Sequence, residues 1–430
     1  MFETFKNAWK IEDLRKRLLY TLMILIIFRL GVALPVPFLE PSALSAMVNS
    51  TGNMLGYIDM LTGGAFSQAT LFALSVTPYI NASIIVNLLQ VAIPYLERLS
   101  QEGEDGRRKI MKITRYAGLG ISVLLSIAYY FLLRKQNAVQ YTEGFAGWLC
   151  AIVIIVSFSA GAMLIMWLGE RIDDKGIGNG ISLIIFAGIV SRFPSIFTTV
   201  KAALELAKEG QTKYYFMLPL LAVLALAAIA FIVVMNAGER RIPVQYAKRV
   251  VGRKMYGGQS THIPLKVNMS GVMPIIFASA LISIPGTIKG ILNLTSGFWA
   301  TVLGIFDYSS WGYAIFYLVL IVAFNYFYVA IQYDPLKISN DLRKNNGAIP
   351  GIRPGKPTQD YIRRVLGKIT FIGAVFLAAI ALLPILIGNV TGMNIHLGGT
   401  SLLIVVGVAL DTSRQLESYM LMRHHKGFLE

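Results

Sequence analysis

Two glycine-rich motifs are the first candidates for chemistry, because glycine loops can cradle the phosphates of nucleotides. The run 176–180 (GIGNG) has part of the dinucleotide-binding spacing, but no predicted strand precedes it and no strand–helix–strand unit follows. Residues 351–357 (GIRPGKP) are similar to a phosphate loop, yet the spacing is one residue short and Pro357 follows Lys356. We therefore expect no nucleotide site and no cofactor.

The residues that ligate metals or act as nucleophiles are few and scattered. His262, His396, His424 and His425 lie in predicted loops and in the C-terminal tail, and Cys150 is the one cysteine. One cysteine excludes an intrachain disulfide and a cysteine-built metal site, so no metal is expected. No Asp or Glu lies in the middle of an apolar run, which disfavours a carrier driven by protons or cations. We expect a passive path rather than an enzyme.

The chain as a whole is very apolar. Of its 430 residues, 55% are hydrophobic and 14% are charged, whereas soluble domains have roughly a quarter charged residues. A membrane helix needs about 20 mostly apolar residues, and continuous apolar runs predict helices rather than a barrel. We expect an all-α, multi-pass membrane protein with ten transmembrane helices. The predicted spans are 18–36, 75–93, 116–133, 148–168, 181–200, 214–235, 271–289, 312–331, 369–387 and 400–412.

The net charge of the chain is +16, and the distribution of its Lys and Arg residues among the loops indicates how it is oriented in the membrane. Cytoplasmic loops of membrane proteins carry an excess of Lys and Arg. With the N-terminus in the cytoplasm, 31 of the 39 Lys and Arg residues lie on the cytoplasmic side, seven lie outside, and Arg29 lies within the first span. Both termini are therefore expected in the cytoplasm, which requires an even number of spans. The run 400–412 is short enough to be re-entrant, and the even number favours a crossing helix.

The longest polar external segment, 201–213, divides the chain into two halves with five spans each. The N-terminal half is 1–200, the C-terminal half is 214–412, and 413–430 is a cytoplasmic tail. Because five is odd, the second half crosses the membrane in the opposite sense to the first, as in an inverted repeat. Residues 201–213 are expected to form an external hinge between the halves.

The second span of each half carries a proline, and inverted repeats have their sites where such spans are broken. Pro78 and Pro274 are expected mid-helix, where proline removes a backbone hydrogen bond and kinks the chain, although prolines are also common in membrane helices. Residues 57–70, broken by Gly63 and Gly64, are too short to cross. They form either an interfacial connector or a half-helix folded back into the membrane, which is tolerated only when buried or lining a cavity.

Two cytoplasmic loops, 237–268 and 332–368, are longer and more basic than orientation requires. They hold seven and eight Lys or Arg residues, respectively. One explanation is attraction to anionic lipid, worth about 1 kcal/mol per basic residue near the surface. The other is docking on nucleic-acid phosphates or on an acidic protein, which is slightly favoured by fixed turns such as those at Pro243 and Pro350.

Taken together, these motifs resemble the SecY family, the channel subunits of the bacterial protein-export translocon. The resemblance extends from end to end and implies two inverted five-helix halves around a central pore. It also implies that the tenth run crosses the membrane. The stretches that carry it, in the family's order, are 73–89, 102–110, 167–190, 240–249, 257–279, 349–358 and 398–406.

The resemblance implies roles for individual residues inside the membrane. A pore ring of apolar side chains would exclude ions by dewetting, without a charged filter. The matching ring residues are Val76, Ile80, Ile181, Ile185, Ile276 and Ile404. The segment 57–70 matches the plug that blocks the external funnel, including Asp59, Gly63, Gly64 and Phe66.

The resemblance also implies a lateral gate and a docking surface. Spans two and three would face spans seven and eight across the gate, with Asn87 and Asn268 as its polar positions. The docking surface for the ribosome and for the motor SecA would include Arg253, Lys254, Arg353 and Lys356.

The expected function is therefore a protein-conducting channel in the bacterial plasma membrane. It would translocate unfolded secretory polypeptides and release hydrophobic segments laterally into lipid, driven by SecA and ATP, the ribosome or the membrane potential. The expected partners are SecE, SecG, SecA, the ribosome, preproteins with signal sequences, SecDF, YidC and anionic lipids. A secondary transporter for a small solute and a membrane scaffold are the alternatives; the lack of intramembrane acids argues against the first.

Overall fold

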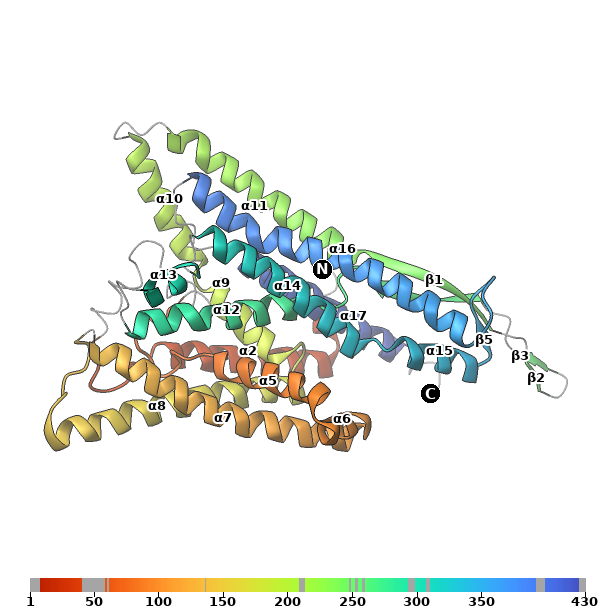
Figure 1. Cartoon of the computed structure of the whole chain (residues 1–430), viewed down its shortest axis with the longest axis horizontal. Coiled ribbons are helices and arrows are strands. Elements are labelled where there is room, and N and C mark those ends of the chain that lie inside the picture. The colour runs from red at the N-terminus through yellow and green to blue at the C-terminus, as the bar shows by residue number, and fades with distance from the viewer. Residues whose placement is uncertain are drawn as a thin grey trace.

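The computed structural model shows an elongated bundle of helices with strands at one end (Figure 1). It describes residues 8–40, 59, 62–135, 137–208, 213–246, 249–251, 254–256, 260–292, 298–306, 310–391 and 399–424. Docking residue Arg253 and part of the segment 57–70 lie outside the described residues.

The described residues of the first half are mainly helical, with a stretch of turns at 62–76. Its described helices are α2 (Glu12–Val32), α5 (Thr77–Ala92), α6 (Pro94–Gln101), α7 (Glu104–Lys135), α8 (Gly144–Lys175), α9 (Gly180–Val190) and α10 (Phe193–Lys208). Asn179 begins α9 as its N-cap, because its side-chain oxygen accepts a hydrogen bond from the Ser182 N–H at 3.0 Å.

The second half combines long helices with a small sheet. Its described helices are α11 (Lys213–Ala237), α12 (Met273–Leu292), α13 (Phe298–Gly304), α14 (Trp311–Gln332), α15 (Pro335–Lys344), α16 (Lys356–Thr391) and α17 (Gly399–His424). Its strands are β1 (Glu239–Tyr246), β2 (Arg249–Val251), β3 (Lys254–Tyr256), β4 (Ser260–Lys266) and β5 (Gly347–Ala348).

The described helices follow the predicted spans in order. Each predicted span overlaps one helix, or for the fifth span one broken helix pair, namely α2, α5, α7, α8, α9–α10, α11, α12, α14, α16 and α17. Within the described residues, five helices are long and apolar enough to cross a membrane, and the bent pair α5–α6 would be a sixth. Helices α9 and α12 are apolar but shorter.

The prediction of mid-helix kinks at Pro78 and Pro274 is wrong. Each proline is the second residue of its helix, α5 or α12. Proline suits this place because the N–H groups of the first turn have no partner within the helix, so none is lost. The two prolines therefore begin helices inside the bundle, and the breaks precede them.

The second and fifth spans are broken elsewhere. Helices α5 and α6 meet at an angle of 104°, with Ile93 in an extended conformation ahead of Pro94. The residue before a proline is disfavoured in the α-helical conformation, which explains the break. Helix α9 ends at Val190 and α10 starts at Phe193 and continues to Lys208, so 201–208 of the expected external hinge is helical.

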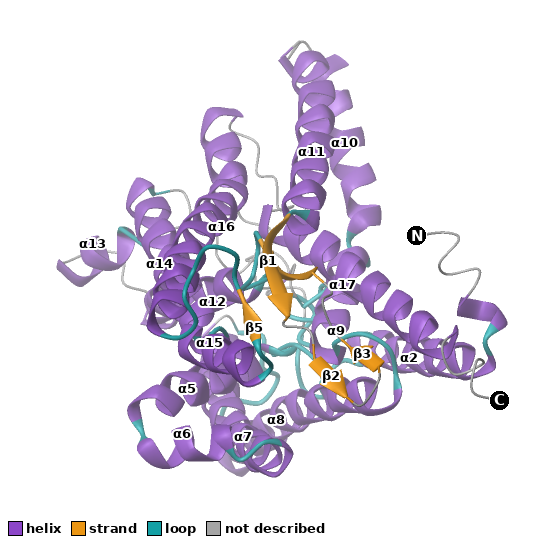
Figure 2. Ribbon diagram, turned by 90° about the vertical axis from the view of Figure 1, so that its right-hand side faces the viewer, coloured by secondary structure: helices purple, strands orange, loops and turns teal. Residues whose placement is uncertain are grey.

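The basic segments 237–268 and 332–368 are more regular than loops. Strand β1 pairs antiparallel with β4, from Glu239 opposite Lys266 to Gln245 opposite Ser260, and β5 adds a short third strand. Figure 2 faces this end and shows β1 and β5 in front of the helices. The apolar face of the hairpin packs on α14, α15 and α16 through a buried cluster that includes Ile242, Val244, Leu265, Ile362 and Leu366.

Aliphatic side chains also fill the interior where the halves meet. One buried cluster joins residues of α2, α8 and α9 to Ile404 and Val408 of α17. Another joins α12, α14 and α16 to Ile84 of α5. Large apolar side chains remain exposed on the outer helices, for example Phe145, Phe216 and Val223, as expected for surfaces that contact lipid.

We expect Gly161→Ala to destabilise the bundle by about 1–3 kcal/mol, the range for overpacking a core. An added Cβ at Gly161 of α8 would lie 1.9 Å from the backbone oxygen of Leu71, which cannot rotate away. The matched control is Gly120→Ala on α7, where nothing lies within 4 Å of an added Cβ and alanine favours the helix. Thermal unfolding in detergent measures both, and equal melting temperatures would contradict the packing at Gly161.

Candidate functional site

A small cavity at the centre of the bundle is lined by aliphatic residues from four helices. Val76 is the N-cap residue of α5, Ile80 lies near the start of α5, and Ile276 lies near the start of α12. Ile185 of α9 and Ile404 of α17 also line it. The cavity measures about 30 Å³, room for about two water molecules. Five of the six predicted ring residues therefore surround one constriction.

The sixth residue, Ile181, lies one turn before Ile185 on α9 and outside this lining. It packs against the same central cluster of apolar residues. An added Cβ at Gly169 of α8 would lie 3.1 Å from the Ile181 Cδ1 atom, so the two helices are in close contact there. Ile181 therefore belongs to the same apolar cluster as the cavity without lining it.

Three hydroxyl residues that the sequence did not single out also line the cavity, namely Ser75, Thr77 and Ser279. Ser279 donates a hydrogen bond to the Ile276 carbonyl oxygen at 2.9 Å, so its hydroxyl has a partner on its own helix. Ser75 has a positive φ of 46°, a conformation that is uncommon for residues other than glycine. No spacing in the sequence marks these residues, because Ser75 and Thr77 belong to the turn that starts α5.

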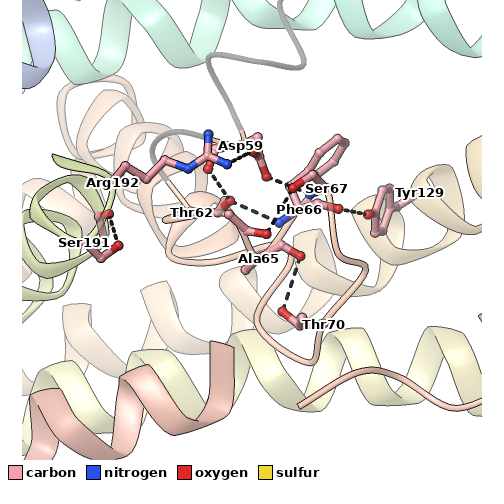
Figure 3. A network of polar contacts seen from close by, with 11 residues as sticks. Asp59, Thr62, Ala65, Phe66, Ser67, Thr70, Tyr129, Ser191 and Arg192 are labelled. Carbon is pink, nitrogen blue, oxygen red and sulfur yellow. Dashed lines mark hydrogen bonds and ion pairs between the residues drawn. The ribbon is translucent and has the colours of Figure 1, made fainter. Parts of the chain in front are cut away.

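The chain ahead of α5 consists of turns buried against the helices. Residues 62–69 form consecutive turns instead of the half-helix that the sequence suggested. Hydroxyl groups replace the missing helical hydrogen bonds: Thr62 donates to the Asp59 carbonyl oxygen at 3.0 Å and Ser67 donates to the Gly64 carbonyl oxygen at 3.2 Å (Figure 3). These hydrogen bonds satisfy backbone carbonyl groups that could not find a partner in lipid.

An ion pair ties this segment to the break between α9 and α10. The Asp59 side chain is 1% exposed, and its Oδ2 atom lies 2.5 Å from Nη2 of Arg192, which is 33% exposed (Figure 3). Oδ1 of Asp59 accepts a hydrogen bond from the Ser67 N–H at 2.7 Å. A buried carboxylate is costly unless it is paired and hydrogen-bonded, and Asp59 is both.

The two glycines of the segment permit a close approach to α9. Gly63 has φ +69° and Gly64 has φ +93°. An added Cβ at Gly63 would lie 3.0 Å from the Cα atom of Gly188 and 3.0 Å from Nη1 of Arg29. Arg29, the single basic residue predicted within a span, therefore lies beside the segment at the end of α2.

The remaining predicted residue of the segment, Phe66, anchors it to α7. Its ring stacks on Tyr129 with a centroid distance of 4.7 Å, and the Tyr129 hydroxyl donates to the Phe66 carbonyl oxygen at 2.6 Å. Tyr129 also contacts Phe158 of α8, with the ring centroids 4.9 Å apart. Anchors from α7, α8 and α9 thus surround the segment.

The two asparagines expected at a lateral gate have different environments. Asn87 is half-buried on α5. Asn268 is buried just before α12, and its amide donates to the Asn236 side chain of α11 at 2.8 Å. Among the hydrogen bonds of the described residues, none joins Asn87 to Asn268. Helix α12 nevertheless packs against both α5 and α7, so the helices expected on the two sides of the gate are in contact.

Two of the predicted docking residues lie on one exposed turn between β5 and α16. Arg353 and Lys356 are both exposed, and Gly351 and Gly355 have positive φ values of 82° and 105°. Thr358 donates to the Arg353 carbonyl oxygen at 2.8 Å, and Ser339 donates to the Gly355 carbonyl oxygen at 3.0 Å. These bonds fix a rigid basic turn. The backbone of Lys254 lies in β3, in the separate two-stranded ribbon.

A family model described as SecY matches residues 70–413. The chain belongs to the SecY family. The protein translocase subunit SecY of Thermotoga maritima is 44% identical across all of this chain and 98% of that protein. The corresponding subunit of Streptomyces coelicolor is 41% identical over the full length of both proteins.

Solved structures support the same fold for this SecY chain. A protein-conducting channel aligns with a TM-score of 0.61 at 17% identity, covering 94% of this chain and 92% of that one. Sec61 in a canine ribosome–channel complex aligns with a TM-score of 0.57 at 16% identity, with the same two coverages. The chain is thus a multi-pass membrane protein with the helical fold of these channels.

We expect Asp59→Asn to loosen the segment of turns, because the ion pair between Arg192 and Asp59 would be lost. Breaking a buried pair costs about 3–5 kcal/mol, and the partial exposure of Arg192 lowers our expectation to about 1–3 kcal/mol. The measurement is maleimide labelling of Ser67→Cys, whose site is buried; the one native cysteine, Cys150, is buried as well. Labelling should accelerate in the Asp59→Asn background.

The control for this measurement is Glu40→Gln, which removes an acid elsewhere in the N-terminal half. Adding Arg192→Gln to Asp59→Asn should recover part of the lost stability, because it removes the cation that no longer faces a carboxylate at position 59. Labelling of Ser67→Cys that is equally slow with and without Asp59 would show that the ion pair does not hold the segment.

Proposed function

We propose that this chain is a protein-conducting channel that moves unfolded secretory polypeptides across the bacterial plasma membrane and releases hydrophobic segments sideways into lipid. The observation that carries the proposal is the central cavity of about 30 Å³, lined mainly by aliphatic residues from four helices. In a member of the SecY family, such a constriction has the size and chemistry of a closed pore.

The proposed pore ring consists of Val76, Ile80, Ile181, Ile185, Ile276 and Ile404. Without charged groups in its lining, it would block ions by dewetting. Aliphatic contacts are non-directional, so the same ring can deform around a polypeptide of any sequence. Ile181, placed behind the cavity in the closed form, would join the lining when the ring widens.

The proposed plug is the segment 57–70, with Asp59, Gly63, Gly64 and Phe66 as its key positions. Its support is the burial of its described part and its contacts with α7, α8 and α9. The ion pair with Arg192 would hold it in the closed position, and a passing polypeptide would displace it. Opening would continue sideways between α5 and α12, with Asn87 and Asn268 as polar gate positions.

The two proposed halves, 1–200 and 214–412, would separate about a hinge in 201–213. The motion would open the gate and widen the ring together, because residues of both halves contribute to each. The tail 413–430 and the basic segments 237–268 and 332–368 would lie in the cytoplasm with both termini, as the distribution of Lys and Arg indicates.

We assign Arg253, Lys254, Arg353 and Lys356 to a docking surface for SecA or the ribosome. The rigid basic turn at Arg353 supports this, since fixed cations can pair with carboxylates or with RNA phosphates. The channel would be passive and take energy from these partners or from the membrane potential. SecE, SecG, SecDF, YidC, preproteins and anionic lipids complete the proposed partners.

The test of this function is protease protection of a preprotein. We expect the full chain, reconstituted in vesicles with SecE and SecG, to give protected preprotein after SecA and ATP are added. Arg353→Glu should lower the yield severalfold, because it reverses the charge at position 353 and cancels the positive charge of the turn. Arg363→Glu on α16 is the matched control and should leave the yield unchanged. A wild-type chain that gives no protection contradicts the proposed function, and full activity of Arg353→Glu contradicts the docking assignment.

A second prediction concerns the closed pore. Deleting residues 60–69 should raise the resting ion conductance of planar bilayers that contain the chain, because the ring alone would then separate the two solutions. Replacing the same ten residues by a Gly/Ser linker of equal length distinguishes loss of the plug from shortening of the chain. Unchanged resting conductance in both variants would refute the plug assignment. Solute uptake that a protonophore abolishes would instead support a secondary transporter.

A further inference from the structure

The glycine-rich turn 176–180 between α8 and α9 is held by side chains from other helices. The Ile177 N–H donates to the Thr21 hydroxyl of α2 at 3.1 Å, and the Gly178 N–H donates to Oε1 of Gln415 on α17 at 2.9 Å. A phosphate loop would present such N–H groups to a nucleotide. In this protein its own side chains accept these hydrogen bonds, so the turn connects three parts of the chain.

Two further hydrogen bonds fix the start of α9. The Gly180 N–H donates to Oδ1 of Asp173, near the end of α8, at 2.7 Å. Asn179 is the N-cap that accepts a hydrogen bond from the first turn. Helix α9 therefore begins at a defined place, and the proposed ring residues Ile181 and Ile185 follow within its first two turns.

The glycines of the turn allow α2 and α17 to approach it closely. An added Cβ at Gly176 would lie 2.5 Å from the Thr21 hydroxyl oxygen. At Gly178, which has φ +91°, an added Cβ would lie 3.1 Å from Oγ1 of Thr412. The motif is thus explained by close packing against two helices.

Apolar contacts surround these hydrogen bonds. Ile177 is 2% exposed and belongs to a buried cluster with Leu14 of α2 and Leu416 of α17. The Arg17 guanidinium of α2 lies over the Tyr419 ring of α17, 5.5 Å from its centroid. Helix α17 continues beyond the predicted tenth span to make these contacts, and it lies beside α2 in Figure 2. We call the turn and the ends of α2 and α17 that hold it the joint.

The other two helices that line the central cavity are held differently. Val76, the N-cap residue of α5, makes no side-chain capping hydrogen bond. Helix α5 meets α12 through aliphatic contacts, such as those of Ile84 with the cluster that includes Ile282. Aliphatic contacts are non-directional and can slide, whereas the hydrogen bonds of the joint require a particular geometry.

Two fixed connections therefore join the halves, at opposite ends of the fifth span. One is the chain itself at 201–213, where α10 ends and packs against α11. The other is the joint, where α9 begins. A single connection permits rotation about any axis through it, but two connections define one axis.

We propose that the joint keeps Ile185 of α9 beside Ile404 of α17 in both the closed and the open pore. The halves would turn about an axis through the joint and 201–213, and the ring would widen because α5 and α12 move apart. Thr21 and Gln415 are then positioning residues, which act on the ring through α9. The inference rests on the proposed function and adds which side of the ring stays in place.

The first experiment measures maleimide labelling of Ile185→Cys, whose site is buried, in a chain with Cys150→Ser. The variant T21V/Q415L removes both acceptors and leaves the buried Ile177 N–H unsatisfied. Labelling should become about tenfold faster, because an unsatisfied buried N–H shifts an opening equilibrium by roughly that factor. The matched control T21S/Q415E keeps both acceptors and should label as slowly as the wild type.

Labelling of Leu377→Cys on α16, which is also buried, measures general loosening and should stay slow in T21V/Q415L. Equal labelling of Ile185→Cys in the two double variants would contradict positioning by the joint. Faster labelling at both cysteine positions would contradict it as well. If the melting temperature shows that T21V/Q415L does not fold, the single variant Gln415→Leu decides.

The second experiment locks the joint. In the Cys150→Ser chain, R17C/Y419C allows a bismaleimide to link α2 to α17, and the reagent is removed before SecA is added. We expect the linked chain to give as much protease-protected preprotein as the unreacted chain. Loss of protection only after linking would show that the halves separate here and would overturn the proposal. If the unreacted chain gives no protection, the proposed function fails instead, and labelling of Ile185→Cys still decides whether the joint positions α9.

Discussion

A carboxylate without access to water dictates the arrangement of the centre of this protein. Asp59 is buried among helices, and an isolated charge there would be very costly. It is tolerated because Arg192 and the Ser67 N–H both reach it. Arg192 is available because α9 ends at Val190 and a new helix starts at Phe193. The break in the fifth span and the turns before α5 thus depend on each other. Polar groups of the irregular backbone inside this membrane protein are satisfied by protein groups rather than by solvent.

The positions of the spans could be predicted because burial in lipid requires long apolar runs, which are visible in composition alone. The places where helices break or begin within the spans could not be predicted equally well. Pro78 and Pro274 were recognised as breaks, but a proline is equally compatible with a kink and with a helix start, and local sequence does not distinguish them. The segment 237–268 was interpreted as a basic cytoplasmic loop because it lies between two predicted spans. Its hairpin depends on Ile242 and Val244 finding a buried surface on α16, a tertiary effect.

Some residues of the candidate functional site could be predicted from the sequence, and others could not. The ring residues followed from resemblance to a family, and five of them do surround one cavity. Nothing in the sequence indicated the Asp59–Arg192 ion pair, because the two residues are 133 positions apart. Each of them looks like an ordinary charged residue near the end of a span. The same holds for Tyr129, whose hydroxyl reaches the backbone of Phe66 from another helix. Such contacts arise from the fold, and residue spacing carries no information about them.

The two prolines have an electrical consequence. Because Pro78 and Pro274 each occupy the second position of a helix, α5 and α12 both begin at the constriction, and residues at both starts line the same cavity. The N-terminal end of a helix carries roughly half a positive elementary charge. Two such ends converge on this small, mainly apolar cavity, so both add positive potential there although neither Lys nor Arg is among its described lining residues. In the proposed channel, a small cation at this cavity would meet an electrostatic barrier in addition to the apolar ring.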